Sequence, residues 1–446
     1  MKSRERELYK KILIIAMPIA MQNFMQSALN MLDIFMVGKL GDDAIAAVGS
    51  ANQLFFLMVL LMFGINSGAN VFTAQYWGKG DIISIKKVFG IALILSTAGS
   101  LIFAMISFFM AEEIIAIFRK ESSVIKLGAE YLRIVLISYI FTAASFSVAV
   151  ILRSMGKNSM PMVTSIISFF LNGILNYILI FGKFGFPAMG VKGAAVATTI
   201  ARVVEFIITF GVIYLWKYEI AGKLRELINF NFSYLKEFIK VSLPVIINEV
   251  MWAGGMVAYF YIYSKISKSA AAAVTIEGSI ERMALVIFIG TASATGAIIG
   301  NTIGSGEKER AYEYSKQIIK LGIILAVTVG IIVFFSSSYI LSFYNVSDKV
   351  KKDALYLTWA FAMYLPVKIF NLHNVIGILR SGGDTKYAMF LDITGMWLIS
   401  IPLGLFCVFF TELSVVIIFL IMNSEEIFKF IMGVIRFKSK KWINEL

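Results

Sequence analysis

The chain has 446 residues, of which 59% are hydrophobic and 15% are charged, and its formal net charge is +13. Soluble globular proteins are nearer half apolar and a quarter charged, so we predict an all-α protein that crosses a membrane many times, not a soluble enzyme. One cysteine and one histidine exclude a disulfide framework and a histidine metal cluster, and the positive charge is typical of cytoplasmic loops rather than of nucleic-acid binding.

Apolar segments long enough to span a bilayer recur along the whole chain. A spanning helix needs roughly 20 mostly apolar residues, and by that criterion we expect about twelve. The charged residues 1–11 lead straight into the first segment without a short apolar region and cleavage site, so no removable signal peptide is expected. The segments are centred near residues 22, 61, 97, 139, 171, 204, 249, 288, 327, 363, 396 and 421.

The distribution of Lys and Arg predicts the orientation. An even number of spans puts both termini on one side of the membrane. The loops on that side, such as residues 217–240, and both tails hold most of the Lys and Arg. By the positive-inside rule we expect both termini in the cytoplasm of a cell whose inner membrane holds the protein.

The sequence also repeats with a period of about half its length. Four pairs of motifs in register indicate a duplicated six-helix unit, with lobes at residues 1–222 and 223–446 joined through the polar stretch 217–240. Two parallel six-helix halves are typical of alternating-access transporters with a substrate path between the lobes. The paired motifs are PIAMQN and PVIINE, QYWGKGD and NTIGSGE, EYLRIV and LYLTWA, and LRSMGKNSMPM and LRSGGDTKYAM.

The first apolar segment carries a polar stripe. Gln22, Gln26, Asn30 and Asp33 are spaced four, four and three residues apart, which places them on one helical face. A carboxylate facing lipid is costly, so the stripe is expected to face the bundle interior or a water-filled cavity. There Asp33 is suited to bind a proton or a cation; the alternative is that it is merely solvated near the helix end.

Two asparagines, Asn172 and Asn176, lie one turn apart in the fifth segment. Their amide oxygens are suited to ligate Na⁺ or to hydrogen-bond a protonated acid. The alternative is ordinary hydrogen bonding between helices.

The seventh segment places an acid beside aromatic residues. Glu249, Trp252, Met256 and Tyr259 recur at helical spacing, and Asn248 precedes the acid. A carboxylate beside aromatic rings suits an organic cation through charge and cation–π attraction. The alternative is an aromatic packing face with Glu249 neutral or paired.

Further candidates lie in the eighth and tenth segments. We expect Glu277 to face solvent near a helix start, at the mouth of the substrate cavity, and we expect Asn371 and Asn374 to line it. Lys368 is a candidate partner for Glu249.

Three other charged residues are expected to have structural roles. Arg202 and Glu205 are predicted to pair one turn apart. Arg153, like its counterpart Arg380, is predicted to hold the last carbonyl groups of a helix or to hold the lobes closed at the cytoplasmic side.

Together these motifs resemble the multidrug and toxic compound extrusion (MATE) transporters. The resemblance rests on the Gln22–Asn30 stripe with its preceding proline and on a set of further motifs in the family's order. These are LDIFMVGKLGDDAIAAVG, QYWGKGD, LRSMGKNSMP, NGILNYILIFGKFGFPAMGVKGAAVAT, PVIINEVMW and ILRSGGDTKYAM.

The resemblance implies a twelve-helix, two-lobe fold that exports amphipathic, often cationic drugs in exchange for Na⁺ or H⁺. Asp33 matches the first-helix aspartate proposed to couple transport to the ion. Asn172 matches the fifth-helix asparagine beside it, so these two residues are the candidate Na⁺ ligands. Asn176 stands where several members have Asp, which favours H⁺. Glu249 matches the glutamate of members that couple in the C-terminal lobe.

Three other functions compete with drug antiport. A flippase for a lipid-linked saccharide would need a cavity rich in cations for the pyrophosphate, whereas the two central stripes are polar or acidic. A membrane enzyme would need a cluster of nucleophile, base or metal ligands, and a channel would not need dissimilar stripes in two lobes. We therefore expect a monomeric transporter without a cofactor, with small-molecule drugs and the bilayer as partners.

Overall fold

The computed structural model describes the chain from residue 2 to residue 446, and it describes side chains from residue 6 onward except that of Asn30. Within this part the chain is helical, with no strand. Eleven of its helices are long and apolar enough to span a membrane. The twelfth predicted segment corresponds to α15 and α16, which are separated at Asn423. The prediction of an all-α fold is confirmed.

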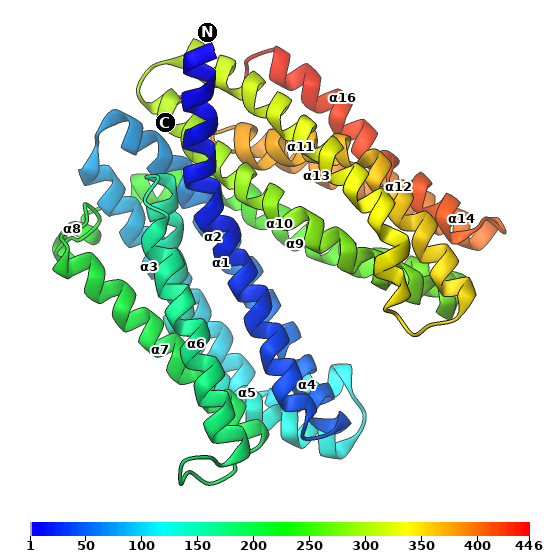
Figure 1. Cartoon of the computed structure of the whole chain (residues 1–446). Coiled ribbons are helices and arrows are strands. Elements are labelled where there is room, and N and C mark those ends of the chain that lie inside the picture. Colours follow the sequence, from blue (N-terminus) through cyan, green and yellow to red (C-terminus); the bar gives the residue numbers. More distant parts are fainter. Residues whose placement is uncertain (1) are drawn as a thin grey trace. The chain divides into compact units, whose positions relative to one another are not determined.

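The first half of the chain contains six long helices, which can be followed by their labels in Figure 1. Two short helices, α4 and α8, accompany them. The bounds are α1 Lys2–Gly38, α2 Asp42–Lys79, α3 Ile82–Phe109, α4 Ala111–Phe118, α5 Ser122–Ser154, α6 Ser159–Phe181, α7 Val191–Leu215 and α8 Leu224–Leu227.

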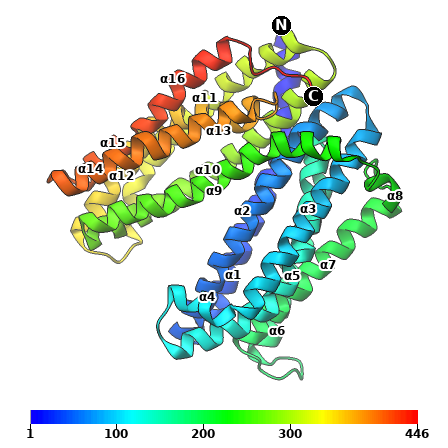
Figure 2. The same ribbon diagram turned by 180° about the vertical axis from the view of Figure 1, so that it is seen from behind.

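The second half begins with four long helices (Figure 2). Two π-helical segments further along the chain form continuous spans with the helices next to them. Thus α12 and η1 form one span, and α13, η2 and α14 form another. The bounds are α9 Phe232–Ile266, α10 Lys268–Gly304, α11 Lys308–Ser342, α12 Asp348–Leu372, η1 His373–Leu379, α13 Thr385–Ile393, η2 Thr394–Ser400, α14 Ile401–Phe410, α15 Val415–Met422 and α16 Ser424–Lys438.

The sequence repeat extends to the backbone. Gly80 and Gly306, which are equivalent in two of the paired motifs, both have positive φ angles, 74° and 81°. Gly156 and Gly383, from another pair, have φ angles of 75° and 79°. Because glycine adopts this region without steric cost, each pair marks the same tight turn in both halves.

The chain divides into two compact units. One comprises residues 18–246, and the other comprises residues 1–17 and 247–446. The division therefore lies inside α1 and α9, beside Pro18 and Pro244, rather than in the linker 217–240. A proline inside a helix removes a backbone hydrogen bond and introduces a kink.

In the unit of residues 18–246, α5 packs against α2, α3 and α7, and α6 packs against α7. The core around α5 includes the fully buried side chains of Met58, Leu132 and Tyr139. In the other unit, α12 packs against α10, α11 and α16, around a core that includes Phe288 and Phe361. Each unit thus has its own apolar core.

Candidate functional site

Three polar stripes meet inside the unit of residues 18–246. The predicted stripe of α1 is joined by stripes on α6 and α7, and side-chain hydrogen bonds connect all three helices. The members of each stripe are three, four or seven residues apart, so each stripe lies on one face of its helix. The members with described contacts are Gln22, Gln26 and Asp33 on α1, Ser165, Asn172 and Asn176 on α6, and Thr198, Arg202 and Glu205 on α7.

Asp33 ends a chain of amide hydrogen bonds. Its carboxylate is buried, with 5% of the residue exposed, and Asn176 Nδ2 donates to Asp33 Oδ1 at 2.5 Å. Asn176 also donates to Asn172 Oδ1 at 2.8 Å, and Asn172 donates to Thr198 Oγ1 at 3.1 Å. The structure therefore brings together the three predicted residues of the ion-coupling site in this lobe.

The chemistry of this cluster suits a single positive charge. Among the described residues, no Lys or Arg forms an ion pair with Asp33, and a buried carboxylate is costly unless it is paired. Asn176 Oδ1 is buried without a partner. One carboxylate and nearby amide oxygens can hold a proton or a monovalent cation, and no group of three or more His, Cys, Asp or Glu in the described part of the chain could hold a metal ion.

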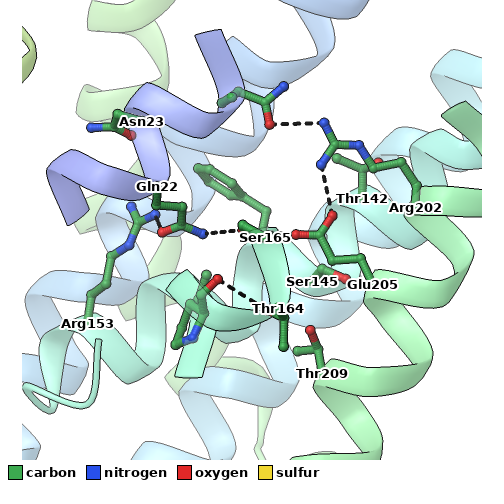
Figure 3. A pocket seen from close by; sticks show the side chains of 14 residues that line it. Gln22, Asn23, Thr142, Ser145, Arg153, Thr164, Ser165, Arg202, Glu205 and Thr209 are labelled. Atoms are coloured by element: carbon green, nitrogen blue, oxygen red, sulfur yellow. Dashed lines mark hydrogen bonds and ion pairs between the residues drawn. The ribbon is translucent and has the colours of Figure 1, made fainter. Parts of the chain in front are cut away.

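A polar cavity of about 110 Å³ lies further along the same stripes. Gln22 donates to Ser165 at 3.1 Å, and Ser165 donates to Glu205 at 3.0 Å. Arg202 donates to Glu205 at 2.8 Å and to Gln26 Oε1 at 2.9 Å. Figure 3 shows this network lining the cavity. The predicted pairing of Arg202 with Glu205 is confirmed.

Arg153 faces the same cavity from the C-terminal end of α5. Its guanidinium donates to Gln22 Oε1. No described carboxylate lies within ion-pair distance of Arg153. Among the described contacts, Arg153 does not hold the carbonyl groups at a helix end, because its side chain reaches across to α1 instead. The alternative role in lobe closure stays a prediction.

In the unit of residues 1–17 and 247–446, Glu249 is paired with an arginine. Arg380 Nη1 lies 3.0 Å from Glu249 Oε1, and Asn248 beside it donates to Asp392 at 2.8 Å. Lys368 instead pairs with Glu281 at 2.5 Å. The prediction that Lys368 pairs with Glu249 is therefore wrong, and the alternative of a paired Glu249 describes the geometry.

The expectation that Glu277 faces solvent near a helix start is also wrong. Because α10 begins at Lys268, Glu277 lies more than two turns into the helix, and only 2% of the residue is exposed. Glu277 Oε1 is buried without a hydrogen-bond partner. Asn371 is buried too, and it donates to Glu426 Oε2 at 2.6 Å.

The remaining predicted cavity residues differ in their exposure. Trp252 and Met256 are 42% and 46% exposed, whereas Tyr259 is half-buried. Asn374 is fully buried, and neither of its amide atoms has a partner. The side chain of Asn30 lies outside the described residues, so its part in the stripe of α1 stays a prediction.

Sequence reasoning missed the contributions of Ser165 and Thr198 and the contact that Arg153 makes. A signal for α7 was available, because Thr198, Arg202, Glu205 and Thr209 are spaced four, three and four residues apart. That pattern matches the stripe of α1 and predicts one polar face. The contact of Arg153 with Gln22 had no such signal, because it joins residues far apart in the sequence.

The fold and the buried polar network define a polytopic helical membrane protein of the transporter class. A family model described as MatE matches residues 18–178 and again residues 244–406, one match in each half. The chain therefore belongs to the MATE family of multidrug efflux transporters.

Two relatives of similar length are described as probable multidrug resistance proteins. The chain is 26% identical to a probable multidrug resistance protein NorM of Thermotoga maritima, over 99% of this chain and 94% of the relative. It is 24% identical to a probable multidrug resistance protein YoeA of Bacillus subtilis, over 93% of this chain and 90% of the relative.

Solved structures agree with the fold. The Vibrio cholerae MATE transporter VcmN in its bent form matches with a TM-score of 0.88 and 16% identity, over 99% of this chain and 100% of that chain. An outward-facing multidrug resistance MATE transporter matches with a TM-score of 0.86 and 21% identity, over 97% of both chains. At these identities the likeness shows the fold alone.

Proposed function

We propose that the protein is a secondary active antiporter that exports amphipathic, often cationic drugs in exchange for H⁺ or Na⁺. Asp33 is the coupling group of this proposal. Membership of a family of multidrug efflux transporters supports the drug substrates, and the amphipathic and cationic character is our inference. The protein would act as a monomer in the cell membrane with both termini in the cytoplasm, as the loop charges predict.

The observation that carries the proposal is the state of Asp33. The carboxylate is buried on a helix long and apolar enough to span a membrane, its described hydrogen-bond partner is the neutral Asn176, and no described Lys or Arg forms an ion pair with it. An intramembrane acid without a countercharge is favourable only when a proton or a cation accompanies it. Binding and release of that ion would then be tied to the conformation of α1.

The residue at position 176 favours the proton. An Asp at this position would supply a second carboxylate for Na⁺, whereas Asn176 leaves Asp33 as the one acid of the hydrogen-bonded chain described above. A single carboxylate is neutralised when it binds one proton, and it needs no further ligands to do so.

The test uses purified protein in liposomes that accumulate ethidium. A pH gradient alone and a Na⁺ gradient alone are imposed on the wild type, on Asp33→Asn and on a control, Asp42→Asn, which removes an exposed carboxylate from the first turn of α2. Transport driven by the pH gradient, lost in Asp33→Asn and kept in the control, is expected.

The other results of this experiment are equally informative. Transport driven by Na⁺ and lost in Asp33→Asn would keep the site and change the ion. Undiminished coupled transport by Asp33→Asn would overturn the role of Asp33, and no transport under either gradient would overturn antiport itself.

The flippase alternative is less well supported. A pyrophosphate would call for several unneutralised cations, but Arg202, Arg380 and Lys368 are each paired with a glutamate. In the polar cavity of residues 18–246, Arg153 is the arginine without a described carboxylate partner.

A further inference from the structure

Two arginines that are equivalent in the repeat make different contacts in the two halves of the chain. Arg153 in LRSMGK and Arg380 in LRSGGD occupy the same place in the repeat. Arg380 lies 3.0 Å from the carboxylate of Glu249, which is on α9. Arg153 instead contacts the neutral amide of Gln22. In the aligned motifs, PIAMQN has an Asn where PVIINE has Glu249, so the first half lacks the built-in carboxylate.

The space around Arg153 is a cavity rather than packed side chains. Its volume is about 110 Å³, and Arg153 and Arg202 reach it from opposite sides in Figure 3. Arg202 is neutralised by Glu205 at 2.8 Å. With Arg153 charged, the lining therefore carries one net positive charge. Arg153 is half-buried, with its Nε atom fully covered. A charge withdrawn from water without a countercharge is costly, so this cavity favours an anion.

Unused hydrogen-bond donors line the same space. Arg153 Nε, Gln26 Nε2 and Ser145 Oγ are all buried without a partner, and all three residues line the cavity. Buried polar atoms are normally hydrogen-bonded, so three unpartnered polar atoms in one cavity indicate that a ligand binds there. The unused nitrogens are donors, which matches an acceptor such as an anion.

We propose that this cavity binds a monovalent anion, a carboxylate or a halide, in the role that the Glu249 carboxylate has beside Arg380. The anion sits against the Arg153 guanidinium and accepts hydrogen bonds from Gln26 and Ser145. It comes either from solution or from a carboxylate on a transported amphiphile. Only the second source rests on the proposed export function, and the site lies apart from the chain of contacts that begins at Asp33.

The volume agrees with this class of ligand. One water molecule has a share of liquid volume of about 30 Å³, so the cavity has room for a few waters or for one chloride or acetate ion with water. Arg donates through a planar fork that matches a carboxylate, and its contact with Gln22 uses one of the two terminal nitrogens.

The first experiment measures anion binding without transport. The melting temperature of the purified protein is followed in detergent while chloride or acetate replaces isethionate at constant ionic strength, because isethionate is a sulfonate and so neither a carboxylate nor a halide. A ligand that binds only the folded state raises stability in a saturable way. We expect a saturable increase with both small anions.

Two variants and a control test the site. Gln22→Glu places a carboxylate against Arg153, as Glu249 stands against Arg380, and should abolish most of the anion-dependent shift while the protein stays folded. Arg153→Gln should weaken apparent anion affinity at least tenfold. Arg133→Gln removes an arginine from the same helix whose charge pairs with Glu112, and it should keep the wild-type response.

The source of the anion is distinguished with two dyes that differ in one group. Rhodamine 110 has a free carboxylate and rhodamine 123 is its methyl ester. If the carboxylate comes from a transported amphiphile, acetate should compete with rhodamine 110 and not with rhodamine 123, and Gln22→Glu should weaken binding of rhodamine 110 alone. If the anion comes from solution, acetate should shift the melting temperature without displacing either dye.

A melting temperature that does not depend on which anion is present would overturn the proposal. The cavity would then be interpreted as filled by water. The same conclusion would follow if Gln22→Glu or Arg153→Gln responded to chloride and acetate like the wild type. Because these measurements use no ion gradient, their failure is separate from failure of coupled drug export.

Discussion

Asn176 holds the carboxylate of Asp33 with a hydrogen bond of 2.5 Å, and the same amide nitrogen reaches Asn172 Oδ1 at 2.8 Å. The donor that fixes Asp33 is therefore shared with a second acceptor. Asn176 Oδ1 has no partner of its own. This arrangement places two amide oxygens near one acid, and we expect the ion preference of the cluster to depend on the charge at residue 176.

Substituting Asn176 by Asp should shift ion preference toward Na⁺. A second carboxylate beside Asp33 raises the local negative charge, and two close carboxylates favour a shared proton or a cation between them. We expect Na⁺-driven ethidium transport by Asn176→Asp to increase about tenfold relative to transport driven by a pH gradient, a difference of about 1.4 kcal/mol.

The control for this prediction is Asn176→Leu, which removes both the donor and the oxygen. Both gradients should then drive transport poorly, because Asp33 loses its described partner. An Asn176→Asp protein with an unchanged ratio of Na⁺-driven to H⁺-driven transport would show that residue 176 does not select the ion.

Thr198→Val should reduce coupled transport less than Asn176→Leu does. Thr198 accepts a hydrogen bond of 3.1 Å from Asn172, and three contacts in a row separate it from Asp33. Leaving a buried donor unsatisfied costs about 1–3 kcal/mol. The expected result is a lower melting temperature and reduced coupled transport. Thr198→Ser, which keeps the hydroxyl, should restore both, and equal losses in Val and Ser would show that the methyl group rather than the hydrogen bond matters.

Much of the fold was predictable because it depends on local patterns. Apolar length determines a membrane span, and the helical spacing of Gln22, Gln26 and Asp33 places them on one face before any tertiary contact is known. These parts of the prediction needed no knowledge of which helices are neighbours.

The partners of the charged residues could not be predicted in this way. Glu249 pairs with Arg380 and Lys368 with Glu281, and each pair is separated by many residues in the sequence. Each charged side chain has several possible partners of opposite charge in the sequence, and the rotation of the helices determines which of them it contacts. Glu277 shows the same limit, since its burial depends on where α10 begins.

The ion pair of Glu249 and Arg380 should show strong coupling in a double-mutant cycle. Both side chains are almost fully buried, at 3.0 Å. Removing one partner leaves an uncompensated buried charge and costs about 3–5 kcal/mol, whereas removing both costs less. Glu249→Gln and Arg380→Gln should each lower the melting temperature clearly, and the double variant should recover part of the loss. Additive losses would contradict this pairing.

A close approach of two helices in the unit of residues 18–246 gives a further prediction. Gly68 of α2 lies against Ser242 of α9, and a Cβ atom at Gly68 would come 1.9 Å from Ser242 Oγ and 2.8 Å from Ser242 Cα. The nearby ring of Phe72 stacks on Phe238, with centroids 5.8 Å apart, along the same contact. Small residues allow such backbone approach between membrane helices.

Gly68→Ala must therefore push α9 away from α2, because the backbone of Ser242 cannot move aside as the end of a side chain can. Forcing extra atoms into a packed interface costs about 1–3 kcal/mol, and the melting temperature in detergent should fall by several degrees. Gly49→Ala on the same helix is the matched control, since nothing lies within 4 Å of its added Cβ. There alanine should be neutral or stabilising by about 0.5–1 kcal/mol, because it favours the helix more than glycine does. Equal melting temperatures for the two variants would show that α2 and α9 do not approach this closely at Gly68.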